Sequence, residues 1–213
     1  MARRPISQIR GRSRFRRRPG SREPRSITLI VCEGESEQAY FDAIRIQLKL
    51  RTTEVVIPRD QGGLAPISVV EYAEGRARER GGYDHIFCIF DRDQHESFTR
   101  ARAKVHALAT RPRNPLVIRA VTSIPCFEVW VLLHFERTDA PFAACQNVIQ
   151  RVQMHLPGYQ KADSEVIKEL LTHVEIAMAN AHWLSGRAGI SDENPSTSVH
   201  AVIEHLRAVS APN

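Results

Sequence analysis

The sequence predicts an α/β fold, an open and mostly parallel sheet flanked by helices, with a helical C-terminal extension. Strand and helix patterns alternate over residues 27–135, which is typical of parallel sheets. Two apolar runs, 27–32 and 86–90, are continuous, as expected for strands that are buried on both faces. Later patterns are all helical, so we expect a core at 26–138 and a helical region, 139–213, packed on it.

The first strand, 27–32, is apolar throughout and ends at Glu33. A helix over 36–50 follows, because its apolar residues recur at helical spacing. Ser36 is a suitable N-cap for this helix. Gly34 suits the tight turn between the two elements, because glycine adopts backbone conformations that other residues avoid.

A short strand at 54–58 comes next, and the glycine- and proline-rich segment 59–66 is expected to be a loop. The helix after it spans 67–80 and is ended by the pair Gly81-Gly82. The remaining pattern predicts two further strands and five further helices. The strands are 84–90 and 116–121, and the helices are 98–108, 127–135, 142–156, 164–183 and 197–209.

The N-terminal segment, 1–25, holds ten arginines and a single glutamate, whereas the remaining residues carry 20 basic and 23 acidic side chains. The segment has too few apolar residues to offset its ordering entropy, so we expect it to be disordered. Arginine clusters pair with phosphates, and we expect Arg14, Arg16, Arg17 and Arg18 to bind nucleic acid. The alternative is a solvated arm that tunes solubility or contacts an acidic partner protein.

The sequence contains no apolar run of about eighteen residues, so we expect no membrane span. Cys32, Cys88, Cys126 and Cys145 are widely spaced and form no C-x-x-C pair. We therefore expect reduced cysteines and a cytoplasmic location. The nine histidines show no spacing typical of zinc ligands.

Acidic residues stand where two of the apolar strands end. Glu33 follows the first strand, and Asp91 and Asp93 follow the strand at 84–90. In parallel sheets, ligands bind beyond the carboxyl ends of the strands. Carboxylates that meet there repel one another unless a cation joins them, and hard oxygen ligands suit Mg²⁺ or Mn²⁺. The alternative for the two aspartates is that they cap the next helix.

Several motifs together resemble the RloB family. They are IVCEGESE at 30–37, IFDRD at 89–93, PCFEVWVLLHF at 125–135 and NPST at 194–197, with the arginine-rich start. The resemblance covers about residues 25–207. It implies a bacterial or archaeal protein that is encoded beside an ABC-type ATPase partner and acts in defence against phage. It also implies a TOPRIM-like core, related to topoisomerases, primases, OLD-family nucleases and the toxin subunit of the PARIS system.

The TOPRIM pattern, carried over by position, implies a role for each acid. Glu33 matches the glutamate after the first strand, and Asp91 and Asp93 match the Asp-x-Asp. Similarity to OLD nucleases adds Glu37 as a further metal ligand. It also offers Ser123 and Glu128 as the nearest matches for a serine and a glutamate, and Lys161 as a lysine that serves phosphate.

These expectations describe a Mg²⁺- or Mn²⁺-dependent nuclease, acting on DNA or RNA as the effector of an ATPase-linked antiviral system. The expected ligands of the metal are Glu33, Glu37, Asp91, Asp93 and Glu128. The main alternative is a non-catalytic adaptor or sensor, which binds nucleic acid or the ATPase and holds a structural metal. Cleavage of a nucleotide or signalling molecule, a receiver-like phosphoryl-transfer domain and a homo-oligomer also remain open.

Overall fold

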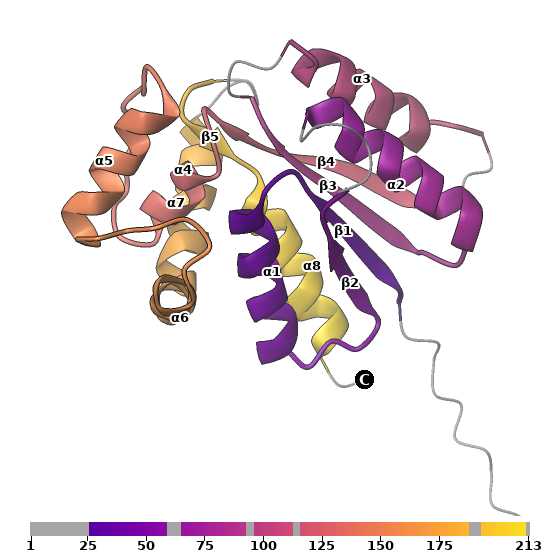
Figure 1. Ribbon diagram of the computed structural model, residues 1–213, viewed down its shortest axis with the longest axis horizontal. Coiled ribbons are helices and arrows are strands. Elements are labelled where there is room, and N and C mark those ends of the chain that lie inside the picture. Colours follow the sequence, from indigo (N-terminus) through magenta and orange to yellow (C-terminus); the bar gives the residue numbers. More distant parts are fainter. Residues whose placement is uncertain (1–25, 59–64, 93–95, 113–115, 188–192, 212–213) are drawn as a thin grey trace, which may run out of the picture.

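A computed structural model describes residues 26–58, 65–92, 96–112, 116–187 and 193–211. Its strands form one five-stranded sheet in the order β2-β1-β3-β4-β5 (Figure 1). The strands are β1 (Thr28–Cys32), β2 (Thr53–Val56), β3 (His85–Asp91), β4 (Val117–Ile124) and β5 (Ser196–Thr197).

The first four strands are parallel, and β5 runs antiparallel to the end of β4. The register pairs Cys32 with Ile89 and Asp91 with Ser123. The carboxyl ends of the central strands therefore lie side by side at the same end of the sheet. This arrangement confirms the predicted α/β fold with a mostly parallel sheet.

Helices cover both faces of the sheet. On one face, α2 (Pro66–Arg80) and α3 (Phe98–Ala109) pack on side chains such as Val31 and Cys88. On the other, α1 (Glu35–Gln47) and α8 (Val199–Ser210) lie side by side, and α8 carries four fully buried core residues (Figure 1). The odd and even residues of each buried strand thus enter different cores, as the pleat requires.

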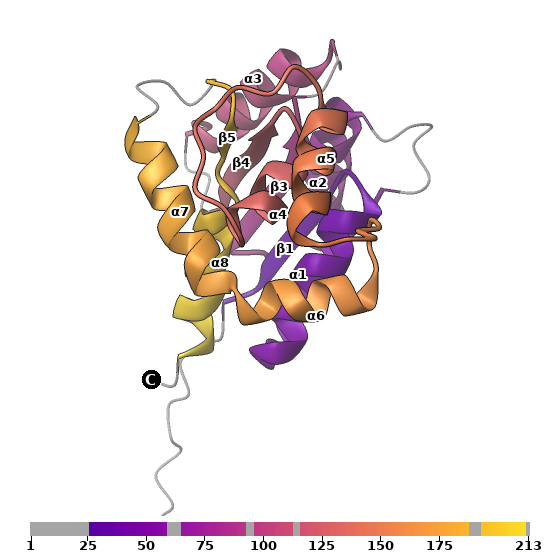
Figure 2. The same ribbon diagram turned by 90° about the vertical axis from the view of Figure 1, so that its left-hand side faces the viewer.

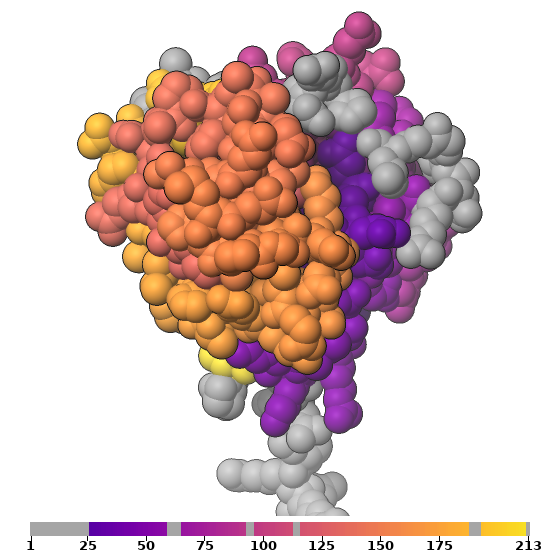
Figure 3. Space-filling model, turned by 60° about the vertical axis from the view of Figure 1, so that its left-hand side comes forward, coloured from indigo at the N-terminus to yellow at the C-terminus, as the bar shows by residue number. Residues whose placement is uncertain are grey.

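The remaining helices form a group at one end of the sheet: α4 (Glu128–Leu133), α5 (Cys145–His155), α6 (Ser164–Thr172) and α7 (Val174–Arg187) (Figure 2). All six residues of α4 are buried, so this short helix is the centre of the group. α6 contacts α1, and Figure 3 shows the orange segment of α5 and α6 against the indigo segment around α1. No helix among the described residues is long and apolar enough to cross a membrane.

Three local predictions are wrong. The single helix expected at 164–183 is two helices, because the chain leaves helical geometry at His173, whose ring and the Thr172 hydroxyl lie within hydrogen-bonding distance of the Glu169 carbonyl. The N-cap of α1 is Gly34, so Ser36 lies within the helix. The last helix begins at Val199, since Ser196 and Thr197 instead pair with β4 as β5.

The expectation that all four cysteines are reduced is also wrong for one pair. Cys126 and Cys145 form a disulfide bond, whereas Cys32 and Cys88 are free and buried in β1 and β3. The two bonded cysteines are nineteen positions apart and stand beside the N-termini of α4 and α5. Only the fold brings them together, so their spacing gave no signal.

Candidate active site

A cavity of about 390 Å³ opens at the carboxyl ends of β1 and β3. Five of its lining residues are acidic and one, Lys161, is basic. They come from the β1–α1 turn, the end of β3, the start of α4 and the loop before α6. The lining residues are Glu33, Gly34, Glu35, Ser36, Glu37, Asp91, Phe127, Glu128, Lys161 and Ala162.

Glu33 and Asp91 are linked directly. The backbone N–H of Asp91 donates to Oε2 of Glu33 at 2.9 Å, and the N–H of Phe127 donates to Oδ2 of Asp91 at 2.8 Å. Each carboxylate therefore keeps one oxygen outside these two bonds. The two hydrogen bonds fix the orientation of both side chains and join β1, β3 and the start of α4.

The carboxylate of Glu37 is buried close to the backbone of Gly34. A Cβ atom at residue 34 would lie 2.7 Å from Oε2 of Glu37, so only glycine leaves room for this approach. Burial raises the pKa of Glu37 to about 7, and the charge of Glu128 acts in the same direction. The charge of Lys161 and the backbone N–H groups of Glu37 and Gly34 oppose that rise.

Asp91 shares this environment. Burial is the largest cause that raises its pKa well above the usual value, followed by the charge of Glu37. Glu33 and Glu128 raise it further, and the hydrogen bond from Phe127 lowers it. Carboxyl groups whose pKa values rise together in this way are held close in a poorly solvated site, where a cation would stabilise their ionised forms.

Glu128 is 1 % exposed and lies at the first position of α4. Its Oε1 accepts a 2.8 Å contact from Nζ of Lys161 and lies 3.5 Å from the hydroxyl of Tyr159. Burial acts against the charge of Lys161, but the Glu128 hydrogen bond and the charges of Glu128, Asp91 and Glu37 raise its pKa. The ammonium therefore stays charged beside the acids.

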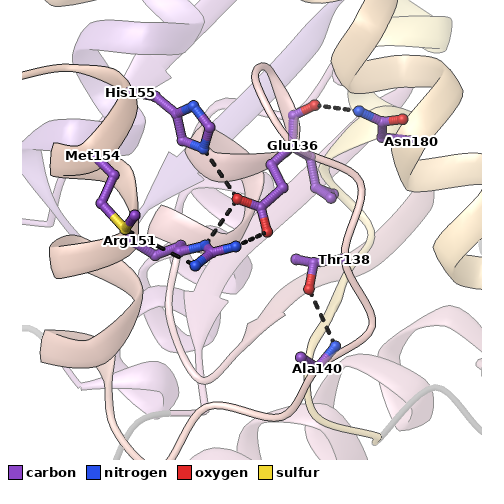
Figure 4. Close-up of polar contacts among 8 residues, drawn as sticks. Glu136, Thr138, Ala140, Arg151, Met154, His155 and Asn180 are labelled. Atoms are coloured by element: carbon purple, nitrogen blue, oxygen red, sulfur yellow. Dashed lines mark hydrogen bonds and ion pairs between the residues drawn. The ribbon is translucent and has the colours of Figure 1, made fainter.

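The disulfide lies against the same carboxylate, with Sγ of Cys145 3.2 Å from Oε2 of Glu128. An oxidised sulfur carries no proton, so this is a packing contact. The helix that bears Cys145 is anchored by Glu136, on which Arg151 and His155 of α5 converge (Figure 4). Glu136 Oε2 lies 2.8 Å from Nε of Arg151 and 3.0 Å from Nε2 of His155.

The donor set fits a hard divalent cation. The four acids Glu33, Glu37, Asp91 and Glu128 offer only oxygen ligands, and they outnumber the one positively charged residue among the described lining residues, Lys161. Their oxygens line one cavity without closing on one point. Among the described residues, the one group of three possible ligand atoms within 4.8 Å of one another is Cys126, Glu128 and Cys145, and its two sulfurs are already bonded to each other as a disulfide. Carboxylates that are spread around a cavity in this way are compatible with Mg²⁺, which keeps several waters and uses few carboxylates.

The structure thus brings five of the sequence-predicted site residues together: Glu33, Glu37, Asp91, Glu128 and Lys161. The predicted ligand Asp93 lies outside the described residues, as do Arg14, Arg16, Arg17 and Arg18. Ser123 does not line the cavity, and its hydroxyl instead lies 3.1 Å from that of Thr197 in β5.

Sequence reasoning missed Tyr159, which is buried and whose hydroxyl lies 3.5 Å from Oε1 of Glu128, the oxygen that Lys161 also contacts. An available signal was its position two residues before Lys161, in a segment between two helices. The structural role of Gly34 beside Glu37 was missed as well, since the sequence suggested only a turn conformation. The backbone of Gly34 is in fact extended, with φ of −130°, so close approach is the reason for glycine here.

Comparison with known proteins supports the resemblance drawn from the motifs. The family model for RloB-like protein matches residues 28–206, which include every described lining residue of the cavity. Searches of curated proteins and of solved structures returned no match. Because the family match spans most of the sequence, the chain belongs to the RloB-like family.

Proposed function

We propose that this chain is a metal-dependent nuclease that hydrolyses phosphodiester bonds in DNA or RNA. The observation that carries the proposal is one cavity into which three separate segments place Glu33, Glu37, Asp91 and Glu128, while a fourth segment places Lys161 beside them. Four acids beside one lysine repel a polyanion unless a cation is present, so substrate binding would depend on Mg²⁺ or Mn²⁺.

Glu33, Glu37, Asp91 and Glu128 would hold the metal. When bound, a divalent ion supplies an activated water and neutralises charge on the phosphate. The protein's own contribution is placement. The N–H of Asp91 orients Glu33, and the N–H of Phe127 orients Asp91. Glu128 positions the ammonium of Lys161, which would hold a phosphate oxygen of the substrate.

The role of the protein as an antiviral effector rests on its family. We infer that an ABC-type ATPase partner controls the nuclease and that the arginines of residues 1–25 attract the nucleic acid backbone. Purified protein would then cut only with Mg²⁺ or Mn²⁺, and its activity would rise or fall with the partner.

The test is a cleavage screen over DNA, transfer RNA and ribosomal RNA, with and without Mg²⁺ or Mn²⁺. The variant Glu33→Gln with Asp91→Asn should lose cutting, because two of the four acids are neutralised while their shape is kept. Glu35→Gln is the matched control, because Glu35 lines the same cavity but is exposed. Cleavage by the double variant at the rate of the parent protein would reject the site.

One observation favours a second function, that of a non-catalytic adaptor or sensor. Among the described residues, no three carboxylates place an oxygen within 4.8 Å of one another, so the acids do not form a closed metal cage without an ion. Phage protection separates the two functions. An adaptor would still protect cells when it carries the double substitution, and it would fail when residues 1–25 are deleted.

A further inference from the structure

One edge of the sheet is mostly unpaired. β5 is two residues long and pairs only with Ser123 and Ile124 at the end of β4. Along the rest of β4, the described residues include no further strand on that side. β4 is eight residues long, so most of its outer edge has no ladder partner within the described parts of the chain. Such an edge can pair with another extended chain.

The direction of the free backbone groups follows from the hydrogen bonds of β4. Val117 donates its N–H to Asp84, and the carbonyl of Ser123 accepts from Arg92, so these odd-numbered residues face β3. Thr122 faces the other way, since its N–H donates to Oγ of Ser198 and its carbonyl accepts from the N–H of Ser198. In a parallel strand, alternate residues bond to one neighbour. Ile118 and Ala120 therefore point their N–H and C=O groups away from β3.

A second cavity, of about 580 Å³, follows this edge. Its lining includes Ile118, Arg119, Ala120 and Thr122 of β4, residues of α3 on one side, and residues of α7, β5 and α8 on the other. Because α3 and α8 cover opposite faces of the sheet, a cavity that touches both must lie beyond the strand edge. Figure 2 shows α3, β4, β5 and α7 grouped at this end of the molecule. We call this cavity the edge groove.

The exposed titratable residues that line the edge groove are basic. Arg119 contributes a guanidinium group and His106 an imidazole. Among the described residues, the lining includes no aspartate or glutamate. The acid cavity shows the opposite balance, so the two sites suit ligands of opposite charge.

We propose that the edge groove binds an extended, acidic peptide segment of a partner protein, which adds to the sheet as a strand beside β4. Outward N–H and C=O groups at two alternate residues match the repeat of an extended chain, which is how strand addition gives affinity. Acidic side chains of the peptide would lie near Arg119 and His106. A second copy of the chain is a poorer occupant, because pairing β4 with itself would bring arginines together.

The peptide site is short. Ser198 already occupies both outward groups of Thr122, so pairing is limited to the region of Ile118 and Ala120. We therefore expect a weak interaction, with a dissociation constant on the order of 100 μM for an isolated peptide. A longer partner that also touches other surfaces would bind more tightly. This interaction is independent of the proposed nuclease activity, so it can hold or fail separately.

The test uses the full ¹⁵N-labelled chain and the capped peptide TEVEVT as the probe. NMR titration should shift the backbone amides of Ile118 and Ala120 and slow their hydrogen exchange. Ala120→Pro should weaken binding at least tenfold, because it removes an outward N–H. The β3–β4 ladder should survive, because proline is tolerated on edge strands and Arg119 before it is already extended.

A charge variant covers the case in which Ala120→Pro does not fold. Arg119→Glu with His106→Glu should reverse the preference, so that TKVKVT binds better than TEVEVT. Equal binding of both peptides to the parent protein would overturn the proposal. So would shifts confined to the acid cavity, or concentration-dependent dimers in sedimentation that Ala120→Pro abolishes, which would identify a second copy as the occupant.

Discussion

The backbone N–H of Asp91 donates a 2.9 Å hydrogen bond to Oε2 of Glu33. Asp91, the last residue of β3, thereby orients the carboxylate of Glu33, which follows the neighbouring strand β1. Asp91 is held in turn by the N–H of Phe127. The orientation of each acid thus depends on the backbone of another segment, and a change at one position affects the next.

This relationship separates two substitutions of Glu33. Glu33→Gln keeps an oxygen that can accept from Asp91, so it should fold with nearly parental stability and lose Mn²⁺ binding. Glu33→Ala leaves the N–H of Asp91 without its acceptor, which should lower the free energy of unfolding by about 1–3 kcal/mol relative to Glu33→Gln. Urea unfolding and calorimetric Mn²⁺ titration measure the two effects. Equal stability of the two variants would contradict the structural role of this bond.

The contribution of Glu37 to stability should fall with rising pH when no metal is present. Glu37 has a folded pKa of about 7 and an ordinary value of 4.5, so between these values the folded chain holds a proton that the unfolded chain has released. At this group the unfolded state then binds fewer protons, and the contribution of Glu37 decreases through this window by roughly 3 kcal/mol. The raised pKa of Asp91 acts in the same direction.

Mg²⁺ should oppose this loss, because metal binding requires the deprotonated acids. Thermal denaturation should therefore show a larger Mg²⁺-induced rise in Tm at pH 8 than at pH 5.5. Glu37→Gln is the control, because the lowered pKa values of His134 and His205 make stability rise with pH over part of the same range. The contribution of Glu37 is therefore the difference in metal-free stability between the parent and this variant, which should change between about pH 4.5 and 7. A Mg²⁺ effect that is the same at both pH values would argue against a metal at these carboxylates.

Gly34→Ala should weaken metal binding while leaving the fold intact. The new Cβ would lie 2.7 Å from Oε2 of Glu37 and force that carboxylate to move, while the extended backbone of residue 34 accepts alanine. We expect a loss of about 10- to 100-fold in Mn²⁺ affinity, as for other residues that support a ligand. Calorimetric titration measures it.

The matched control for that variant is Gly75→Ala in α2, where an added Cβ meets no atom within 4 Å. It should leave Mn²⁺ affinity unchanged and stabilise the protein by about 0.8–1.0 kcal/mol, because alanine favours helix more than glycine does. If both variants bind Mn²⁺ equally well, the close approach of Glu37 to Gly34 does not contribute to metal binding.

Lys161→Met should raise the KM for nucleic acid more than it lowers the affinity for the metal. Its ammonium lies 2.8 Å from Glu128 and its side chain is more than half exposed, so it can also reach a phosphate. We expect KM for the nucleic acid to rise about tenfold, which is about 1.4 kcal/mol of lost binding. Lys168→Met is the control, because Lys168 pairs with the exposed Glu165 on α6. Steady-state cleavage kinetics should distinguish the two variants, and identical kinetics would remove Lys161 from the site.

The Cys126–Cys145 bond should be detectable by counting thiols. Denatured but unreduced protein should react with two maleimides, at Cys32 and Cys88, and reduced protein with four. Closing a loop of this length stabilises by about 3 kcal/mol, so reduction should lower Tm by several degrees. The double variant Cys126→Ser with Cys145→Ser should show no response to reductant. Four reactive thiols before reduction would disprove the bond.

The sequence predicted the parts of the site that depend on local pattern. Glu33 and Asp91 follow apolar strands, and parallel strands place such residues at one edge, as the structure shows. Glu128 and Lys161 were placed by family resemblance, and the structure brings them within 2.8 Å of each other. Their chemical roles remain predictions.

Features that arise from distant contacts could not be predicted. Thr197 has helical neighbours in sequence, yet it pairs with Ser123, seventy-four positions earlier. The break at His173 interrupts a continuous helical pattern, since α6 packs towards α1 while α7 packs towards α4. Local propensity gives no information on either choice.

The late position of α8 in the sequence determines when the core of this protein can be completed during translation. Val199, Val202, Ile203 and Leu206 fill the core beneath the sheet, and β5 extends the sheet itself. The acidic cavity is complete in sequence by residue 162, yet the layer that supports it is not synthesised until about forty residues later. A nascent chain would therefore carry all of its described cavity residues without a finished core, so the cavity would take its final form only after Leu206 has been synthesised.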